Sequence, residues 1–272
     1  MIVKGKEKFR FRTTISLISL VGLLVFAPIT FAEDEKTELA KKTQNPVSDL
    51  ISVPIMNNLG FNAGPEDDLQ NTLNIMAVIP QKISAQWNWI HRAVIPVVSQ
   101  PAPIDEWGLS DIQYQGYLSP AKVDSVVWGV GPVLQMPTAT DDSLGSEKWS
   151  AGAGVVALQM KGSWVYGALL NNIWSFAGAG DREDVNLMFF QPFVNYNLGN
   201  GLAIGSVPQI TANWEADSGN VWTVPIGAQV SKIIPIGKLP INWIAGGYYN
   251  VEKPDNGADW VLRLQVQFLF PK

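Results

Sequence analysis

The C-terminal stretch of the chain, residues 258–272, has two chemically different faces. One set of alternate positions is aliphatic or aromatic, namely Trp260, Leu262, Leu264, Val266, Phe268 and Phe270. The positions between them are largely polar and include Asp259, Arg263, Gln265 and Gln267. Successive side chains of a β-strand point to opposite faces. The pattern therefore predicts a strand of an all-β, transmembrane antiparallel β-barrel, with lipid on the apolar face and water on the polar face.

The N-terminus has the features of an export sequence. A basic segment precedes an apolar run over residues 15–31, which ends in the small-residue motif Thr30-Phe31-Ala32. A basic segment, a short apolar core and an Ala-containing cleavage site together define a secretory signal peptide. We predict that residues 1–32 are a cleaved signal peptide and that the mature protein lies in the bacterial outer membrane. An uncleaved signal anchor is the alternative.

Residues 33–50 are polar and differ from the rest of the chain. A short helix is expected before Asn45-Pro46, because proline disfavours helical geometry in the residue that precedes it. We interpret residues 33–50 as a periplasmic N-terminal extension, and a plug that folds back into the barrel is the alternative. Residues 51–272 contain no linker and are expected to form one barrel domain.

The barrel region divides into twelve alternating segments, an even number that returns both termini to the periplasm. Errors of roughly 2–4 residues at segment boundaries leave ten or fourteen strands as alternatives. The segments lie near residues 51–61, 70–80, 86–98, 109–119, 125–136, 149–159, 163–176, 185–197, 202–214, 221–231, 241–251 and 259–270.

Charges in the connections support this division. Acidic residues collect in the odd-numbered connections, where only Lys148, Arg182 and Lys253 oppose them. The even-numbered connections are mostly shorter and carry Lys82, Lys122, Lys161, Lys232 and Lys238, with Asp124 as their only acid. Long external loops and short periplasmic turns are the asymmetry expected of a bacterial barrel. The acidic connections are therefore predicted to face outward from the cell.

Composition limits the partners and the chemistry. The net charge of −5 argues against nucleic acid as a partner, and the absence of cysteine argues against a disulfide framework. Tryptophans near segment ends suit the headgroup level of a bilayer. Expected partners are outer-membrane lipid and lipopolysaccharide, the barrel-assembly machinery and a small-molecule solute. A soluble β-sandwich or lipocalin-like barrel is the competing fold, but it leaves the alternation of loop charge unexplained.

Several motifs resemble a known family. They are WGVGP (128–132), PTATDDSLGSEKW (137–149), WVYGAL (164–169), QPFVNYN (191–197), ITANWEAD (210–217), WTVPIG (222–227) and YYNVEKPD (248–255). From about residue 38 onward the chain is similar to bacterial outer-membrane proteins grouped under meta-pathway phenol degradation, whose members are often labelled transporters or neuromedin U. The resemblance implies an outer-membrane barrel that takes up small, including aromatic, compounds. One departure is that Pro271 and Lys272 follow the last aromatic residue.

Catalytic motifs are absent from the sequence. It contains no Gly-x-Ser-x-Gly, Walker or His-Glu-x-x-His pattern, and it predicts no catalytic residue, no metal site and no cofactor. Asp141, Asp142 and Glu147 are interpreted as a solvated loop, with a divalent-cation site as the alternative. His91, the only histidine, shares a face with Trp87 and neighbouring apolar residues, which places it toward lipid headgroups; catalysis beside a serine is the alternative.

Polar residues on the inward faces are the candidate functional residues, because water in the lumen relieves the cost of burying them. The lumen-lining set is Arg92, Asp111, Gln113, Gln115, Gln209, Thr211, Asn213, Gln229, Arg263, Gln265 and Gln267. Two interpretations stay open. These residues either line a conducting pore or form a satisfied hydrogen-bond network that fills a narrow barrel.

The sequence as a whole predicts a non-enzymatic outer-membrane channel or transporter for passive passage of small solutes. The resemblance adds that these solutes are small aromatic or hydrophobic compounds. Two other functions remain as alternatives. They are a structural or surface-binding barrel with acidic external loops and, third, an outer-membrane lipid hydrolase.

Overall fold

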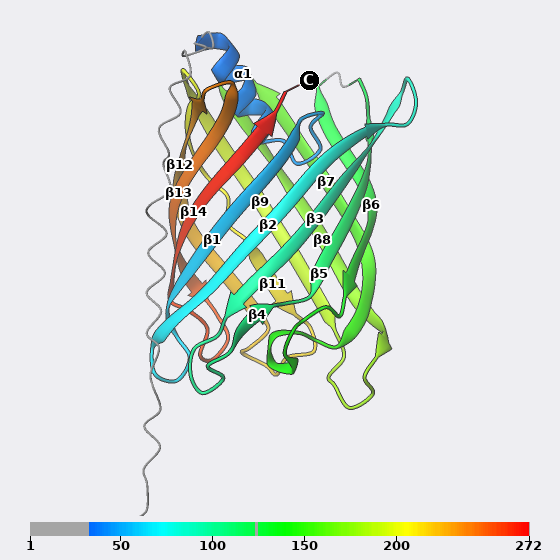
Figure 1. Ribbon diagram of the computed structural model, residues 1–272, viewed down its shortest axis with the longest axis vertical. Helices are drawn as coiled ribbons and strands as arrows, with labels where there is room; N and C mark the ends of the chain where they lie inside the picture. The colour runs from blue at the N-terminus through cyan, green and yellow to red at the C-terminus, as the bar shows by residue number, and fades with distance from the viewer. Residues whose placement is uncertain (1–32, 123–124, 272) are drawn as a thin grey trace, which may run out of the picture.

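The computed structural model describes residues 33–122 and 125–271, which form a helix and a closed antiparallel β-barrel (Figure 1). The signal peptide predicted for residues 1–32 lies outside the described residues. The helix is α1 (Glu33–Thr43), and a 3-10 helix spans Asp142–Leu144. The strands are β1 (Ile51–Ala63), β2 (Asp68–Lys82), β3 (Trp87–Ser99), β4 (Trp107–Leu109), β5 (Ile112–Pro120), β6 (Val126–Met136), β7 (Lys148–Lys161), β8 (Trp164–Gly178), β9 (Asn186–Gly199), β10 (Leu202–Ser206), β11 (Ile210–Asn213), β12 (Trp222–Ile236), β13 (Leu239–Glu252) and β14 (Trp260–Phe270).

The barrel has twelve strand positions, because two positions are each shared by a pair of short strands. β4 and β5 both pair with β3, and β10 and β11 both lie between β9 and β12. The break between β10 and β11 falls at residues 207–209, where Pro208 has no backbone N–H to donate to a ladder. β1 pairs with β14 from Ile51↔Phe270 to Phe61↔Trp260 and closes the sheet. The predicted fold class is confirmed.

The two faces of the strands differ as the sequence predicted. In β14, Leu262 and Leu264 are exposed on the outside of the barrel, whereas Arg263 between them and Gln267 further along the strand are buried. The outer surface therefore presents aliphatic side chains to the surrounding lipid, and the inner surface carries the polar groups of this strand.

Aromatic side chains collect near both ends of the outer surface. Edge-on ring pairs join Trp87 with Trp128 and Trp164 with Tyr196 near the end that carries α1. The contacts Trp214–Trp222 and Tyr249–Trp260 lie near the opposite end. Two such girdles match the two interfaces of a bilayer, where an amphipathic ring is stable.

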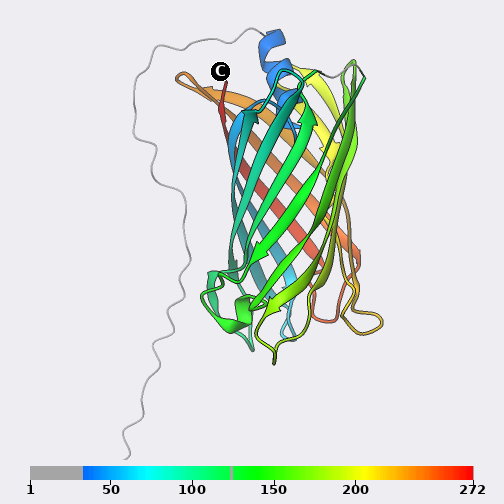
Figure 2. The ribbon, with the colours of Figure 1, turned by 90° about the vertical axis from the view of Figure 1, so that its right-hand side faces the viewer.

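The two ends of the barrel carry different connections. The C-terminus and α1 lie at one end, together with the tight turns after β7, β9 and β12 (Figures 1 and 2). The long acidic connections lie at the other end. The three basic residues among them are all ion-paired, namely Lys148 with Asp184, Arg182 with Glu147 and Lys253 with Asp259. The basic residues in these loops thus serve internal contacts, and the end keeps an excess of acidic side chains.

The N-terminal segment folds back onto the barrel instead of extending away from it. Leu39 and Ala40 of α1 pack with Leu50, Ile233 and Leu269 in one buried apolar cluster. Beyond α1, Val47 is buried inside the barrel and the chain enters β1 at Ile51. The segment after α1 therefore runs back into the barrel before β1 begins. In the part of the chain that the structure describes, no helix is long and apolar enough to cross a membrane.

Candidate functional site

A cavity of about 340 Å³ lies inside the barrel against the N-terminal segment. Its wall contains eight of the eleven residues predicted to line the lumen, namely Arg92, Gln113, Gln115, Gln209, Gln229, Arg263, Gln265 and Gln267. These residues come from β3, β5, β12, β14 and the break before β11. Side chains alternate between the two faces of a strand, and this set points toward the inside of the barrel. We call this space the lumen chamber.

Each nitrogen of the Arg263 guanidinium donates a hydrogen bond to a neighbouring residue. Its Nε donates to Asn58 Oδ1 at 3.0 Å, Nη1 donates to the Val207 carbonyl at 2.8 Å, and Nη2 donates to Gln209 Oε1 at 2.9 Å. The guanidinium also lies 4.7 Å from the centroid of the Tyr248 ring. Arg263 therefore holds the interrupted ninth strand position against β14, which is a structural task in addition to its place in the chamber wall.

Arg92 has a different environment. Its Nη1 is inaccessible and has no hydrogen-bond partner among the described residues. It is paired in register with Gln115 of β5, and both side chains reach the chamber. The chamber wall contains Lys42 as a third cation and no Asp or Glu, so its fixed charge is positive. The two arginines predicted from the same pattern thus play unequal parts.

Amide side chains beside Arg92 form a directed chain of hydrogen bonds. The Tyr117 hydroxyl donates to Gln115 Oε1 at 3.2 Å, and Gln115 Nε2 donates to Gln113 Oε1 at 2.6 Å. The side-chain oxygen of each glutamine accepts one of these hydrogen bonds, so the Gln113 amide nitrogen is the last donor of the chain. Together with Arg92, this arrangement presents N–H groups to the chamber.

Part of the lumen is apolar, in contrast to the water-facing interior expected from the sequence. The buried residues of this cluster are Val47, Ile90, Tyr117, Val127, Val156, Leu158, Val165, Leu169 and Phe193. Side chains from opposite walls of a narrow barrel meet and pack. The sequence pattern missed Phe189 and Phe193 of the chamber wall, because Phe190, Pro192 and Val194 make the outer face of β9 equally apolar and no alternation marks the inner one.

The chain before β1 closes the chamber at the end that carries α1. Residues 42–46 lie in its wall, together with Ser48 and Leu50. Asn242 Nδ2 donates to Thr43 Oγ1 at 3.2 Å, and the side chains of Gln44 and Asn197 bond to each other. Val47 is 5% exposed and joins the apolar cluster. Specific polar and apolar contacts therefore hold the segment before β1 in this position.

Three predicted lumen residues lie outside the chamber wall. Thr211 is the register partner of Phe189 and shares its inward face, farther from the N-terminal segment. Asn213 lines a second pocket, of about 570 Å³, at the acidic end. Asp111 lies outside the chamber wall, and its carboxylate accepts hydrogen bonds from residues 138, 139 and 146.

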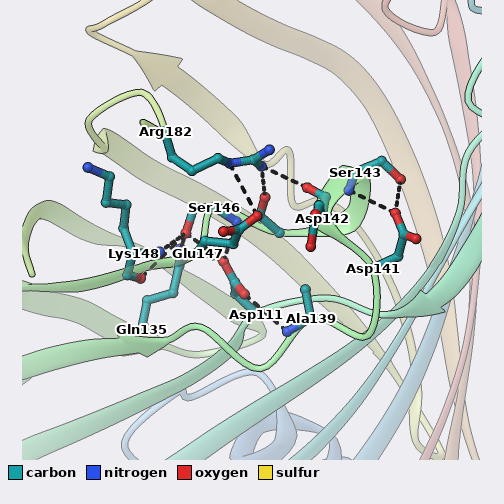
Figure 3. Close-up of polar contacts among 11 residues, drawn as sticks. Asp111, Gln135, Ala139, Asp141, Asp142, Ser143, Ser146, Glu147, Lys148 and Arg182 are labelled. Atoms are coloured by element: carbon teal, nitrogen blue, oxygen red, sulfur yellow. Dashed lines mark hydrogen bonds and ion pairs between the residues drawn. The ribbon is translucent and has the colours of Figure 1, made fainter. Parts of the chain in front are cut away.

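Asp111 anchors residues 138–146 (Figure 3). Oδ1 accepts from the backbone N–H groups of Thr138 and Ala139, at 3.2 and 3.3 Å. Oδ2 accepts from the N–H of Ser146 at 2.8 Å and from its hydroxyl at 2.6 Å. Loop N–H groups left without a strand partner need an acceptor, and a carboxylate binds several of them at once.

A second anchor reaches the same loop from the connection between β8 and β9. Arg182 Nη2 donates to the carbonyls of Asp142 and Gly145 at 2.7 and 2.6 Å, and its Nε lies 3.6 Å from Glu147 Oε1 (Figure 3). Asp141 caps the 3-10 helix by accepting from the Ser143 N–H at 2.9 Å. No group of three or more His, Cys, Asp or Glu in residues 33–122 and 125–271 could hold a metal ion.

His91 lies on the outer surface, on the apolar side of β3. Its Nδ1 is 2.9 Å from the Tyr114 hydroxyl, and its Nε2 is 3.0 Å from Gln81 Oε1. The ring also contacts Trp89, with centroids 6.4 Å apart. Neither imidazole nitrogen contacts a serine. Catalysis by His91, the alternative stated above, requires a hydrogen bond between the histidine and a serine.

Comparison with known proteins supports the fold. No family model matches the chain, and no curated protein matches it. Among solved structures, a COG4313 outer membrane channel from Pseudomonas putida F1 is similar, with a TM-score of 0.58, 14% identity, and coverage of 81% of this chain and 94% of that one. The outer membrane phospholipase A of Escherichia coli matches at a TM-score of 0.40 with 10% identity, over 87% of this chain and 98% of that one. The closed barrel and its apolar outer surface have the architecture of a bacterial outer-membrane β-barrel, and the likeness to the COG4313 channel supports this fold.

Proposed function

We propose that the barrel is a channel for passive passage of small solutes across the outer membrane. The lumen chamber carries this proposal, since it is an unfilled space of about 340 Å³ within a closed barrel, walled by donors as well as apolar groups. Ligand sites typically combine a largely apolar wall with a few placed polar groups. The absence of a nucleotide-binding motif in the sequence agrees with diffusion as the driving force.

The class of solute is proposed from two observations. The motifs quoted above resemble the phenol-degradation group, and the barrel is similar in fold to a COG4313 channel. Phe189, Phe193 and Leu169 in the chamber wall fit small aromatic or hydrophobic compounds. We propose membership of this group of transporters on that basis.

The orientation is proposed from the two unlike ends. The end with α1 and the C-terminus would face the periplasm, and the acidic loops would face outward, next to lipopolysaccharide. This is the arrangement in which periplasmic turns are short and external loops long. It makes residues 33–50 a periplasmic extension that also closes the lumen.

A structural or surface-binding barrel is the second candidate. The observation in its favour is the apolar cluster around Val47 and Tyr117, which fills part of the lumen. A barrel that is filled throughout would carry no solute.

Purified protein in planar lipid bilayers separates these candidates. Stepwise conductance supports the channel, and a silent bilayer together with unchanged liposome permeability supports the structural barrel. Release of fatty acid from the same bilayers would replace both with a lipid hydrolase.

A further inference from the structure

We infer that the lumen chamber is a binding site for a small organic anion, with the acidic group on Arg92 and Gln113 and the apolar body against Phe189 and Phe193. This inference rests on the proposed function and deepens it by naming the solute class. A carboxylate attached to an aromatic ring or a short aliphatic chain is the chemistry that fits.

The first step is the unused guanidinium nitrogen of Arg92. Nη1 is shut off from bulk solvent and lacks a partner among the described residues. An unpaired buried donor on a charged group is costly, and such groups in native proteins are usually satisfied by a carboxylate, water or ligand. An anion in the chamber would supply the missing counter-charge to the Arg92 guanidinium, whose side chain lines the wall.

The second step is the charge balance of the wall. Lys42, Arg92 and Arg263 contribute positive charge, and no acidic residue reaches the chamber. Lys42 has Asp49 within 3.4 Å outside the wall, and Arg263 makes three hydrogen bonds. Arg92 is therefore the cation of the wall whose charge has no acidic partner and whose Nη1 has no hydrogen bond among the described residues.

The third step is the polarity of the amide chain. Because Tyr117 donates to Gln115 and Gln115 donates to Gln113, the chain ends in a donor. A donor chain beside a cation favours an acceptor-only group such as a carboxylate over a hydroxyl or an amine.

The fourth step is the apolar part of the wall. Phe189, Phe193, Leu169 and Val94 reach the same chamber. A volume of about 340 Å³ lies at the small end of the range for ligand sites. The site therefore suits one compact amphipathic anion better than an inorganic ion or a long lipid chain.

Benzoate and its neutral isostere benzamide test this inference with the whole mature protein in detergent. We expect wild-type protein to bind benzoate roughly tenfold or more tightly than benzamide by equilibrium dialysis, as the loss of charge-assisted hydrogen bonds implies. Arg92→Gln should abolish the preference, whereas Lys161→Gln, which removes an exposed charge at the end of β7, should retain it. Heat-modifiable migration on gels shows that each variant is folded.

Equal binding of the two probes to wild-type protein, or no binding of either, would overturn the inference. So would an unchanged preference in folded Arg92→Gln. Should Arg92→Gln fail to fold, Arg92→Lys and displacement of benzoate by acetate in wild-type protein supply the test, and absence of displacement counts against the site. Benzoate binding in a protein that is silent in bilayers would refute the channel alone, and conductance without a preference for benzoate would refute the anion site alone.

Discussion

The carboxamides of Gln44 and Asn197 form a reciprocal pair. Gln44 Nε2 donates to Asn197 Oδ1 at 3.1 Å, and Asn197 Nδ2 donates to Gln44 Oε1 at 3.2 Å. The pair joins the segment after α1 to β9, where Asn197 is 3% exposed. It fixes the position at which the N-terminal segment enters the barrel, next to Val47.

Releasing this segment should open the lumen. In Val47→Asp, a carboxylate would enter the apolar cluster around Ile90 and Tyr117, at a cost of several kcal/mol, so the segment should leave the barrel. We expect higher single-channel conductance and faster tryptic cleavage after Lys41 or Lys42. Glu38→Gln, on the exposed side of α1, is the control. Conductance equal to that of the control would show that the segment does not limit passage.

Asp111→Asn should loosen the loop at residues 138–146. The substitution keeps the shape but removes the charge and replaces one acceptor oxygen with an NH2 group, which weakens the four hydrogen bonds donated by Thr138, Ala139 and Ser146 and the longer one from Gln135. We expect a local loss of about 1.5–3 kcal/mol, measured as faster hydrogen exchange across the loop, with the barrel strands unaffected. Asp142→Asn is the control, since the backbone of Asp142 and not its carboxylate contacts Arg182. Equal exchange in the two variants would contradict this account.

Asp259 should make one loop sensitive to acid. Hydrogen bonds from Asn62 and then Lys253, with the Lys253 charge, lower the pKa of the Asp259 carboxyl below its usual value. A carboxyl with a depressed folded-state pKa contributes stability that is fully present above the unfolded value, near 3.9, and is lost as pH falls through the folded pKa. The contact with Lys253 should therefore persist at pH 5 and disappear in stronger acid. NMR titration of the carboxyl measures this, and Asn62→Ala should move its midpoint upward.

His91→Gln should leave the protein nearly unchanged. Glutamine can replace one of the hydrogen bonds to Tyr114 and Gln81, so the expected loss of stability is within about 1 kcal/mol. Assembly and conductance should match the wild type. Detection of lipid hydrolysis that His91→Gln abolishes would instead make the protein an enzyme.

Single cysteines should report the orientation, because the natural chain has none. Ser143 and Ser218 are exposed in the acidic loops, and Ser163 lies in the turn at the opposite end. Cysteines at the first two positions should react with an impermeant maleimide on whole cells, and a cysteine at Ser163 only after permeabilisation. Labelling of Ser163→Cys alone on intact cells would invert the barrel.

The alternation of polar and apolar residues predicted the strands, because lipid favours an apolar side chain at each outward position. Where polar and apolar residues do not alternate, contacts between distant residues decide the structure. Asn172 interrupts an aromatic face, yet it accepts from Trp214 Nε1 and donates to Asn186, each at 2.9 Å. The different roles of Arg92 and Arg263 depend on the inward path of residues 207–209, which supplies partners to Arg263 alone. Val47, 43 residues or more from its partners in the cluster, could not be assigned to the lumen from its own polar segment.

The pairing of β1 with β14 also determines when the barrel can be completed. Ile51 pairs with Phe270 and Phe61 pairs with Trp260. The first strand to be synthesised therefore cannot form this ladder until the last strand has been synthesised. Contacts of such long sequence separation form slowly, because a long loop must close before they stabilise anything. Until β14 arrives, β1 and β13 each present a row of unpaired backbone groups, which are templates for pairing with other chains. A chain that ends before Trp260 should consequently remain an open sheet, and its two edges should make it prone to aggregation and to degradation.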